Sequence, residues 1–151
     1  MIEARALPGL PEIRPGDDLA GLLARAAGEL RDGDVLVVAH KVVSKAEGAV
    51  VALEAVEPGE EARRLAAGHG KDARAVQVVL DQAVELVRAQ RGVLIARTRH
   101  GFVCANAGVD ASNAAAQGEL ILLPRDPDAS ARALRARLRA LTGAAPAVVV
   151  S

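Results

Sequence analysis

Three polar segments of the sequence carry side chains that could bind a phosphate or a metal ion. Residues 9–12 read Gly-Leu-Pro-Glu, and nearby prolines stiffen this loop so that its backbone N–H groups could bind a phosphate or the edge of a nucleobase. The segment from His40 follows an apolar run and includes the Lys45 ammonium, a point charge suited to phosphate. The segment from Asn106 to Asn113 includes Asp110, a hard oxygen ligand suited to Mg²⁺ or Mn²⁺.

Each segment also has a purely structural interpretation: a connector, a solvated turn and an Asp-x-Ser-Asn turn, respectively. Two further patterns favour structure over chemistry. Residues 68–72 look like a phosphate loop but lack the Gly-x-x-x-x-Gly-Lys-Ser/Thr spacing, so we interpret Asp72 as a helix cap. The three histidines do not have zinc-site spacing, and Cys104 lies in an apolar stretch typical of buried packing.

Composition narrows the class of protein. The chain has 151 residues, of which 51% are hydrophobic and 25% charged, as in an ordinary globular domain. Nineteen basic residues balance nineteen acidic ones, and there is one Phe with no Trp or Tyr, which argues against nucleic-acid partners. A single cysteine, no signal-peptide layout and no apolar run of about 20 residues predict a cytoplasmic protein without a membrane partner.

The elements that must position these segments are predicted from periodicity and caps. Apolar spacing and turn residues predict helices over 18–31, 58–68, 73–90 and 126–143, with Asp17 or Asp18 capping the first and Pro127 opening the last. Apolar runs predict strands over 2–7, 35–39, 49–56, 92–98, 119–123 and 147–151. Residues 40–48 are expected to be a polar connection. Because the last strand pattern stops at Ser151, we expect the chain to be a piece of something longer.

Taken together, these segments resemble one enzyme family. The matching motifs are Leu10-Pro11-Glu12-Ile13 followed by Arg14-Pro15-Gly16-Asp17-Asp18, then Lys-Val-Val-Ser-Lys-Ala-Glu-Gly at 41–48, Gly-Lys-Asp at 70–72, and His-Gly-Phe-Val-Cys-Ala-Asn-Ala-Gly-Val-Asp-Ala-Ser-Asn at 100–113. Ser-Lys-x-Glu-Gly and Ala-Gly-Val-Asp-x-Ser-Asn, in that order and at that separation, are the specific ones. The sequence resembles the coenzyme F420-0:gamma-glutamyl ligases over nearly its whole length.

The resemblance implies an activity and a set of site residues. The family joins L-glutamate to coenzyme F420-0 through a gamma-glutamyl amide bond, using GTP and an acyl phosphate intermediate. It implies Mg²⁺ or Mn²⁺, two per site in the full-length enzyme, with K⁺ as an additional ion, and Asp110 as a metal ligand. His40 departs from the small polar residue that the family often has at its position. The residues implied to contact GTP are Leu10, Pro11, Glu12, Ile13, His40, Lys45 and Asn113.

The resemblance also implies a fold and partners. We expect α+β architecture, a mixed sheet with flanking helices, with residues 1–151 forming a single partial domain of a larger intertwined fold that assembles as a homodimer. Asp110, Lys45 and the proline loop should then surround one triphosphate. The family continues after the last strand into a second metal motif, Asp-Ser/Thr-x-Gly-Arg-x-Trp-Arg, so weak or no ligase turnover is expected from the isolated chain. The alternatives are a non-catalytic nucleotide-binding or dimerisation fragment and a metal-dependent phosphotransferase.

Overall fold

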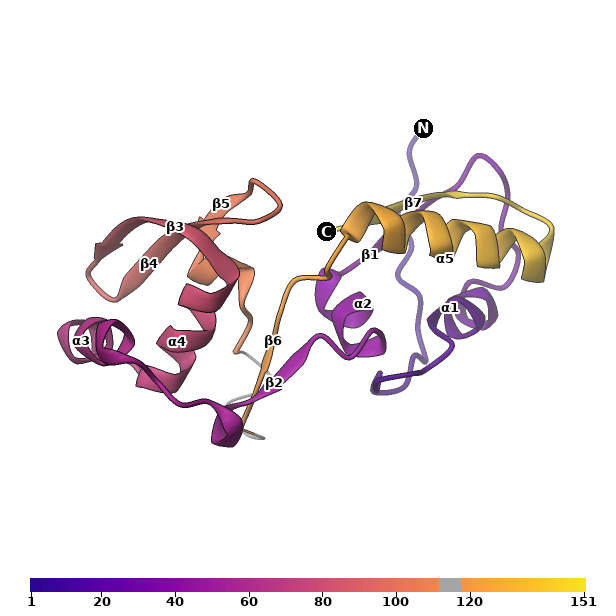
Figure 1. The fold of residues 1–151 in the computed structure, drawn as a ribbon. Helices are drawn as coiled ribbons and strands as arrows, with labels where there is room; N and C mark the ends of the chain where they lie inside the picture. Colours follow the sequence, from indigo (N-terminus) through magenta and orange to yellow (C-terminus); the bar gives the residue numbers. More distant parts are fainter. Residues whose placement is uncertain (112–117) are drawn as a thin grey trace. The chain divides into compact units, whose positions relative to one another are not determined.

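The computed structural model describes residues 1–111 and 118–151, and the chain divides into two compact units (Figure 1). The first unit contains residues 1–48 and 124–151. The second unit contains the described residues between 49 and 123. Each unit has buried apolar clusters of its own.

The first unit packs three helices against a two-stranded parallel sheet. Strand β1 (Val35–Val38) pairs with β7 (Ala147–Val150) in a register that joins Val35 to Ala147 and Val38 to Val150. The helices are α1 (Leu19–Ala27), α2 (His40–Ala46) and α5 (Pro127–Thr142). Their apolar faces meet the inner face of the sheet in a core that includes Ile13, Leu19, Leu23, Leu36, Val38, Val43 and Leu138.

Capping residues define the ends of the first unit's longer helices, as the sequence predicts. The Asp18 side chain accepts a hydrogen bond from the Gly21 N–H at 3.1 Å and so caps α1. Asp126 caps α5 by accepting from the Ala129 N–H at 2.8 Å, and Pro127 opens this helix. At the other end of α5, Gly143 adopts φ of 80°, a left-handed conformation that favours glycine.

The second unit consists of two helices and two antiparallel sheets. Helices α3 (Glu60–His69) and α4 (Ala73–Gln82) pack on the sheet of β3 (Ala83–Gln90), β4 (Val93–Thr98) and β5 (Val103–Ala105) around buried residues such as Leu94 and Val76. Strand β2 (Val50–Ala52) pairs with β6 (Glu119–Ile121). Short 3₁₀ turns η1 (Leu53–Ala55) and η2 (Asn106–Gly108) follow β2 and β5, and the Phe102 ring stacks on His100 before β5 at a centroid distance of 5.6 Å.

The helix predicted over 73–90 is wrong in its second half. Helix α4 ends at Gln82, and residues 83–90 form β3 instead. Register shifts interrupt β3 between Ala83 and Glu85 and between Leu86 and Arg88. Because of these bulges, the inward side chains of Ala83, Leu86 and Ala89 recur every third residue. The apolar stripe that predicts the helix instead runs through Val84 and Val87, whose side chains are exposed on β3. Apolar residues at helical spacing therefore misled the prediction for a bulged strand.

Two further expectations are corrected at the ends of elements. Residues 2–7 form no strand, and the segment 40–48 is not merely a polar connection, since residues 40–46 form α2. The segment 40–46 contains no glycine or proline, and Val43 and Ser44 are buried, so burial of this face favours a helical turn. The predicted α+β class is confirmed. No helix among the described residues is long and apolar enough to cross a membrane.

Candidate functional site

The proline loop of the first unit is anchored on both sides of Glu12. The Ile13 side chain is buried in the core, and Leu10 packs against the same cluster. After Glu12, the Arg14 N–H donates to Asp17 Oδ2 at 2.8 Å, and the Gly16 N–H donates to the carbonyl of Ala46 at 2.9 Å. The second of these bonds ties the loop to the end of α2. Glu12 is therefore held at an exposed position by a fixed backbone.

The Lys45 ammonium meets this loop directly. Its Nζ donates to Glu12 Oε1, forming an ion pair between residues 33 positions apart. The Lys45 side chain is only 17% exposed, whereas that of Glu12 is 69% exposed. Lys45 also lies in the last turn of α2, where the helix dipole favours a cation. A mostly buried cation is thus presented beside a stiff loop, which is an arrangement suited to an anionic ligand.

Lys45 favours the ionised form of the Glu12 carboxylate. The hydrogen bond and the charge of Lys45 hold the pKa of Glu12 below its ordinary value of 4.5, and Arg14 adds a smaller lowering. Glu12 is therefore ionised throughout the physiological range. Its charge orients the Lys45 ammonium, and these two side chains are named the Glu12–Lys45 pair.

Two other side chains of α2 lie close to this pair in sequence and carry buried polar atoms. His40 is held against the end of β7, since its Nδ1 lies 3.2 Å from the Ser151 carbonyl oxygen and its backbone N–H donates to the same oxygen at 2.6 Å. Among the described residues, His40 Nε2 and the Oγ of fully buried Ser44 have no hydrogen-bond partner. Folded proteins rarely leave buried polar atoms without a hydrogen-bond partner.

Glu47, the acidic residue of the Ser-Lys-x-Glu-Gly motif, has a structural contact. Its carboxylate accepts a hydrogen bond from the Ser130 hydroxyl on α5. This contact joins the end of α2 to the first turns of α5. The motif therefore combines a lysine that pairs with Glu12 and a glutamate that joins α2 to α5.

Asp110 lies in the second unit, after a tight turn. Asn106, Ala107 and Gly108 have φ values of 51°, 52° and 74°, and a Cβ on Gly108 would lie 2.7 Å from the Leu123 side chain. Asp110 then exchanges two backbone hydrogen bonds with Ile121, of 2.8 and 3.0 Å. The backbone conformation of this turn thus requires the glycine of the Ala-Gly-Val-Asp motif. The two hydrogen bonds to Ile121 fix the position of the Asp110 backbone, which carries the carboxylate.

The described residues do not form a complete metal site. A divalent cation of the Mg²⁺ class takes several oxygen ligands, and Asp110 offers one carboxylate. Nowhere in residues 1–111 and 118–151 do three or more His, Cys, Asp or Glu side chains gather as metal ligands would. Asp110 could serve as one ligand of a site that needs others.

The predicted site residues therefore fall into three groups. Glu12 and Lys45 meet, and Leu10, Pro11 and Ile13 belong to the same anchored loop, although the buried Ile13 side chain leaves only its backbone for a ligand. His40 lies on the same helix as Lys45. Asp110 belongs to the other unit, and Asn113 lies outside the described residues. The sequence also offers the Ser44 hydroxyl beside Lys45, and the structure places it in a fully buried position. Sequence reasoning missed the Gly16 anchor, because a backbone hydrogen bond to Ala46 leaves no pattern in the residue types.

Two predictions about other candidates are settled by contacts. Asp72 caps α4 by accepting from the Arg74 N–H at 2.8 Å, which confirms the structural interpretation of residues 68–72. The hydrogen bonds from Arg74 hold the pKa of Asp72 below its ordinary value. Cys104 is partly buried, and burial raises the pKa of its thiol, which disfavours the thiolate that a nucleophile needs.

Comparison with known proteins defines the family. The family model described as F420-0:Gamma-glutamyl ligase matches residues 9–151, which includes the proline loop, α2 and the Asp110 segment. The chain belongs to the F420-0:gamma-glutamyl ligase family.

Several curated relatives named coenzyme F420:L-glutamate ligase are similar to this chain. The protein of Methanopyrus kandleri is 53% identical over 140 residues, covering 93% of this chain and 55% of the relative. Those of Methanothermobacter thermautotrophicus and Archaeoglobus fulgidus are 43% and 44% identical, covering 95% and 99% of this chain and 58% and 59% of the relatives. The chain thus spans somewhat more than half the length of the relatives it matches.

Proposed function

We propose that this chain supplies the nucleotide-binding part of a GTP-dependent ligase that joins L-glutamate to coenzyme F420-0 through a gamma-glutamyl amide bond, in coenzyme F420 biosynthesis. The observation that carries the proposal is the Glu12–Lys45 pair. It joins two segments that are distant in sequence, and for both of them the family resemblance implies GTP contacts. Family membership, through relatives named coenzyme F420:L-glutamate ligase, supports the substrates.

The chemistry assigns a role to each part of the pair. In such a ligase, the γ-phosphoryl group of GTP moves to the terminal carboxylate of F420-0, and the resulting acyl phosphate loses phosphate when the glutamate amine attacks its carbonyl carbon. The protein accelerates these steps mainly by positioning groups and stabilising charge. Lys45 neutralises charge on the phosphoryl oxygens, and the anchored loop fixes the nucleotide. Glu12 positions the Lys45 ammonium, and His40 Nε2 offers a further polar contact.

The remaining expectations belong to this same proposal. Asp110 supplies one carboxylate to Mg²⁺ or Mn²⁺, with Asn113 contacting the nucleotide and K⁺ as an additional ion; the other ligands come from outside the described residues. The functional protein is a homodimer in the cytoplasm.

Calorimetric titration of the chain with GTP in MgCl₂ tests the proposal. We expect saturable binding, and we expect Lys45→Ala to weaken it at least about tenfold, since a hydrogen bond to a charged group is worth about 1.5–3 kcal/mol. Arg132→Ala is the matched control, because it removes a positive charge from an exposed position of α5 in the same unit. Affinity should then change less than about twofold.

Two results would overturn the proposal. One is the absence of any heat of binding in the unmodified chain, which would leave a fragment that does not bind nucleotide. The other is equal weakening by Lys45→Ala and Arg132→Ala, which would reduce the role of Lys45 to bulk charge.

A further inference from the structure

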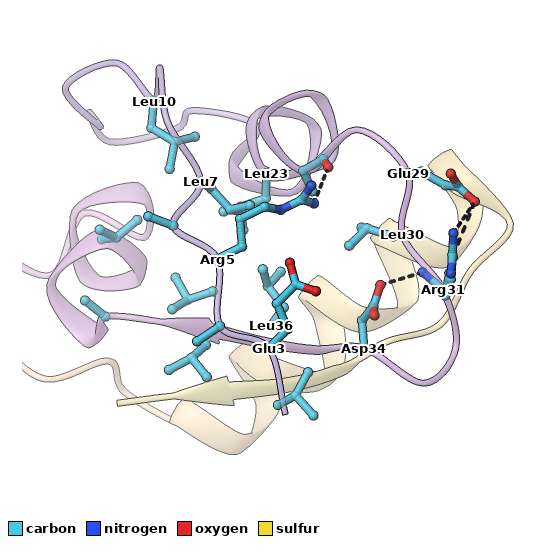
Figure 2. Close-up of a pocket in the computed structure, with 18 residues that line it drawn as sticks. Glu3, Arg5, Leu7, Leu10, Leu23, Glu29, Leu30, Arg31, Asp34 and Leu36 are labelled. Carbon is cyan, nitrogen blue, oxygen red and sulfur yellow. Dashed lines mark hydrogen bonds and ion pairs between the residues drawn. The ribbon is translucent and has the colours of Figure 1, made fainter. Parts of the chain in front are cut away.

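A groove of about 850 Å³ lies in the first unit, between the N-terminal segment and β1 (Figure 2). Residues 3–7 form one wall, and all four residues of β1 form another. Figure 2 shows Leu7, Leu23, Leu30 and Leu36 around the groove, so most of its lining is apolar. Neither Glu12 nor Lys45 lines the groove, although Leu10 of the proline loop is among its lining residues.

The groove runs along the edge of β1 rather than over one of its faces. Its lining includes Leu36 and Val38, whose side chains are buried, as well as Val35 and Val37, whose side chains are exposed. Side chains of successive strand residues point to opposite faces. A cavity that contacts consecutive residues of a strand must therefore lie beside its backbone.

This edge of β1 has backbone groups without partners. On the other edge, the carbonyls of Asp34 and Val38 accept hydrogen bonds from Ala147 and Ser151, each at 2.9 Å. Backbone groups of successive strand residues alternate between the two edges, so the N–H and C=O of Val35 and Val37 point toward the groove. Within the part of the chain that the structure describes, β1 pairs with β7 alone.

The β1–β7 sheet also has fewer strands and less covered faces than parallel sheets usually have. Parallel sheets occur almost only with both faces covered, and a two-stranded sheet is marginally stable by itself. Here Val35 and Val37 are each 61% exposed, and Val149 is 45% exposed. An open edge beside apolar side chains is a ready template for another strand.

Apart from Glu3, the charged side chains around the groove already have partners. The Arg5 guanidinium donates to the Ala27 carbonyl at 3.0 Å, and Arg31 forms an ion pair with Glu29 at 3.3 Å. The Arg31 N–H donates to Asp34 at 2.8 Å (Figure 2). A charged metabolite would have to displace these contacts, whereas an apolar extended peptide needs only the backbone groups of β1.

We propose that this groove receives a β-strand from the part of the family fold that the chain does not span, and that the strand pairs with the Val35–Val37 edge of β1. The relatives supply the reason for this occupant: the chain covers only 55–59% of the length of the three relatives described above. The remaining part of their fold must pack somewhere, and this unit has an apolar groove, an open strand edge and an exposed valine face on one small sheet.

Amide hydrogen exchange, followed by NMR, tests the pairing without nucleotide. The ¹⁵N-labelled chain is co-expressed with an unlabelled polypeptide corresponding to the unmatched part of the Methanopyrus kandleri relative. We expect the complex to be soluble and the amides of Val35 and Val37 to exchange at least about tenfold more slowly than in the chain alone. The Leu36 and Val38 amides, which face β7, serve as the internal reference.

A pair of variants separates strand pairing from side-chain contact. Val37→Pro removes the N–H on the open edge, where proline is tolerated, and should reduce recovery of the complex at least about tenfold. Val37→Thr keeps this N–H and the β-branched shape, and recovery should stay within about twofold. If the Leu36 amide of Val37→Pro loses its protection from exchange, the substitution has impaired the fold. The proposal is then judged by the exchange rates of Val35 and Val37 in the unmodified chain.

Three outcomes contradict the proposal. The first is that the unmodified chain recovers no soluble complex or shows no slowing at Val35 and Val37. The second is that the Val35 and Val37 amides exchange slowly in the chain alone at every concentration, which means that the chain itself fills the groove. The third is protection that rises with the concentration of the chain alone, which identifies a second copy as the occupant. A failure of GTP binding affects none of these readouts, so the two proposals are tested separately.

Discussion

At the scale of single residues, the Glu12–Lys45 pair shows how one contact can join a loop and a helix for binding. The ammonium is largely withdrawn from solvent, while the carboxylate remains exposed. Because Ile13 is buried beside Glu12, the loop cannot swing away without losing apolar contact. The cation is thus positioned before a ligand arrives, which reduces the entropy that binding must overcome.

The titration of Glu12 is the first prediction at this scale. Lys45 lowers the Glu12 pKa in the folded chain, so the pair stabilises the fold above the unfolded pKa near 4.5 and loses this effect as the pH falls through the folded pKa. Carboxyl ¹³C shifts followed against pH should give Glu12 a pKa below 4.5. In Lys45→Ala the pKa should return toward its ordinary value. An unchanged Glu12 titration in this variant would show that Lys45 is not the cause.

Sequence reasoning could find these two residue types but not their contact. A proline-bounded loop and a lysine after an apolar strand each indicate a phosphate site, whereas nothing in a spacing of 33 residues says that the side chains meet. The burial of Ile13 could not be predicted either, because a loop with three prolines gives no periodicity from which an inward face can be read. Whether Asp110 and Asn113 join the same site stays a prediction.

At the scale of elements, local chemistry was most informative at helix ends. Asp18, Asp72 and Asp126 each cap the helix that the sequence assigns to it, since a cap depends on a few adjacent residues. Strand β3 was misread because its bulges depend on pairing with β4, a partner that lies beyond any local window. Helix α2 was missed because seven residues carry too little periodic signal.

The turn before Asp110 gives a prediction for an element. Gly108→Ala places a Cβ at φ of 74° and 2.7 Å from Leu123, so we expect a loss of about 2 kcal/mol or more in the free energy of unfolding of the second unit. Urea unfolding followed by circular dichroism measures this loss. Gly33→Ala is the control, because nothing lies within 4 Å of its added Cβ, and it should change stability by less than about 0.5 kcal/mol. Equal effects of the two substitutions would contradict this account of the turn.

At the scale of the whole molecule, the buried side chains belong to separate clusters. The cluster around Leu138 contains only residues of the first unit, and the cluster around Leu94 contains only residues of the second. The single-domain prediction from chain length stays a prediction. The alternation of helices and strands correctly indicated an α+β protein, but it could not indicate which strands pair, because pairing is decided by contacts distant in sequence.

Substitutions in the core measure how much each cluster contributes to the stability of its unit. Leu138→Ala and Leu94→Ala each remove a fully buried side chain, so each should destabilise the unit that contains it by about 2–5 kcal/mol. Native-state hydrogen exchange reports the two units amide by amide. We expect the larger loss of protection in the unit that carries the substitution. Equal losses in both units from either substitution would mean that the chain unfolds as one cooperative domain.

The stacked Phe102 has a practical consequence for optical spectroscopy of this protein. It is the only aromatic residue of the phenylalanine, tyrosine and tryptophan class in the chain, so absorbance at 280 nm and intrinsic fluorescence are almost silent. Any phenylalanine band in the near-ultraviolet arises from the second unit alone. A tryptophan introduced into the first unit would therefore emit against a dark background, and its signal would belong to that unit without further deconvolution.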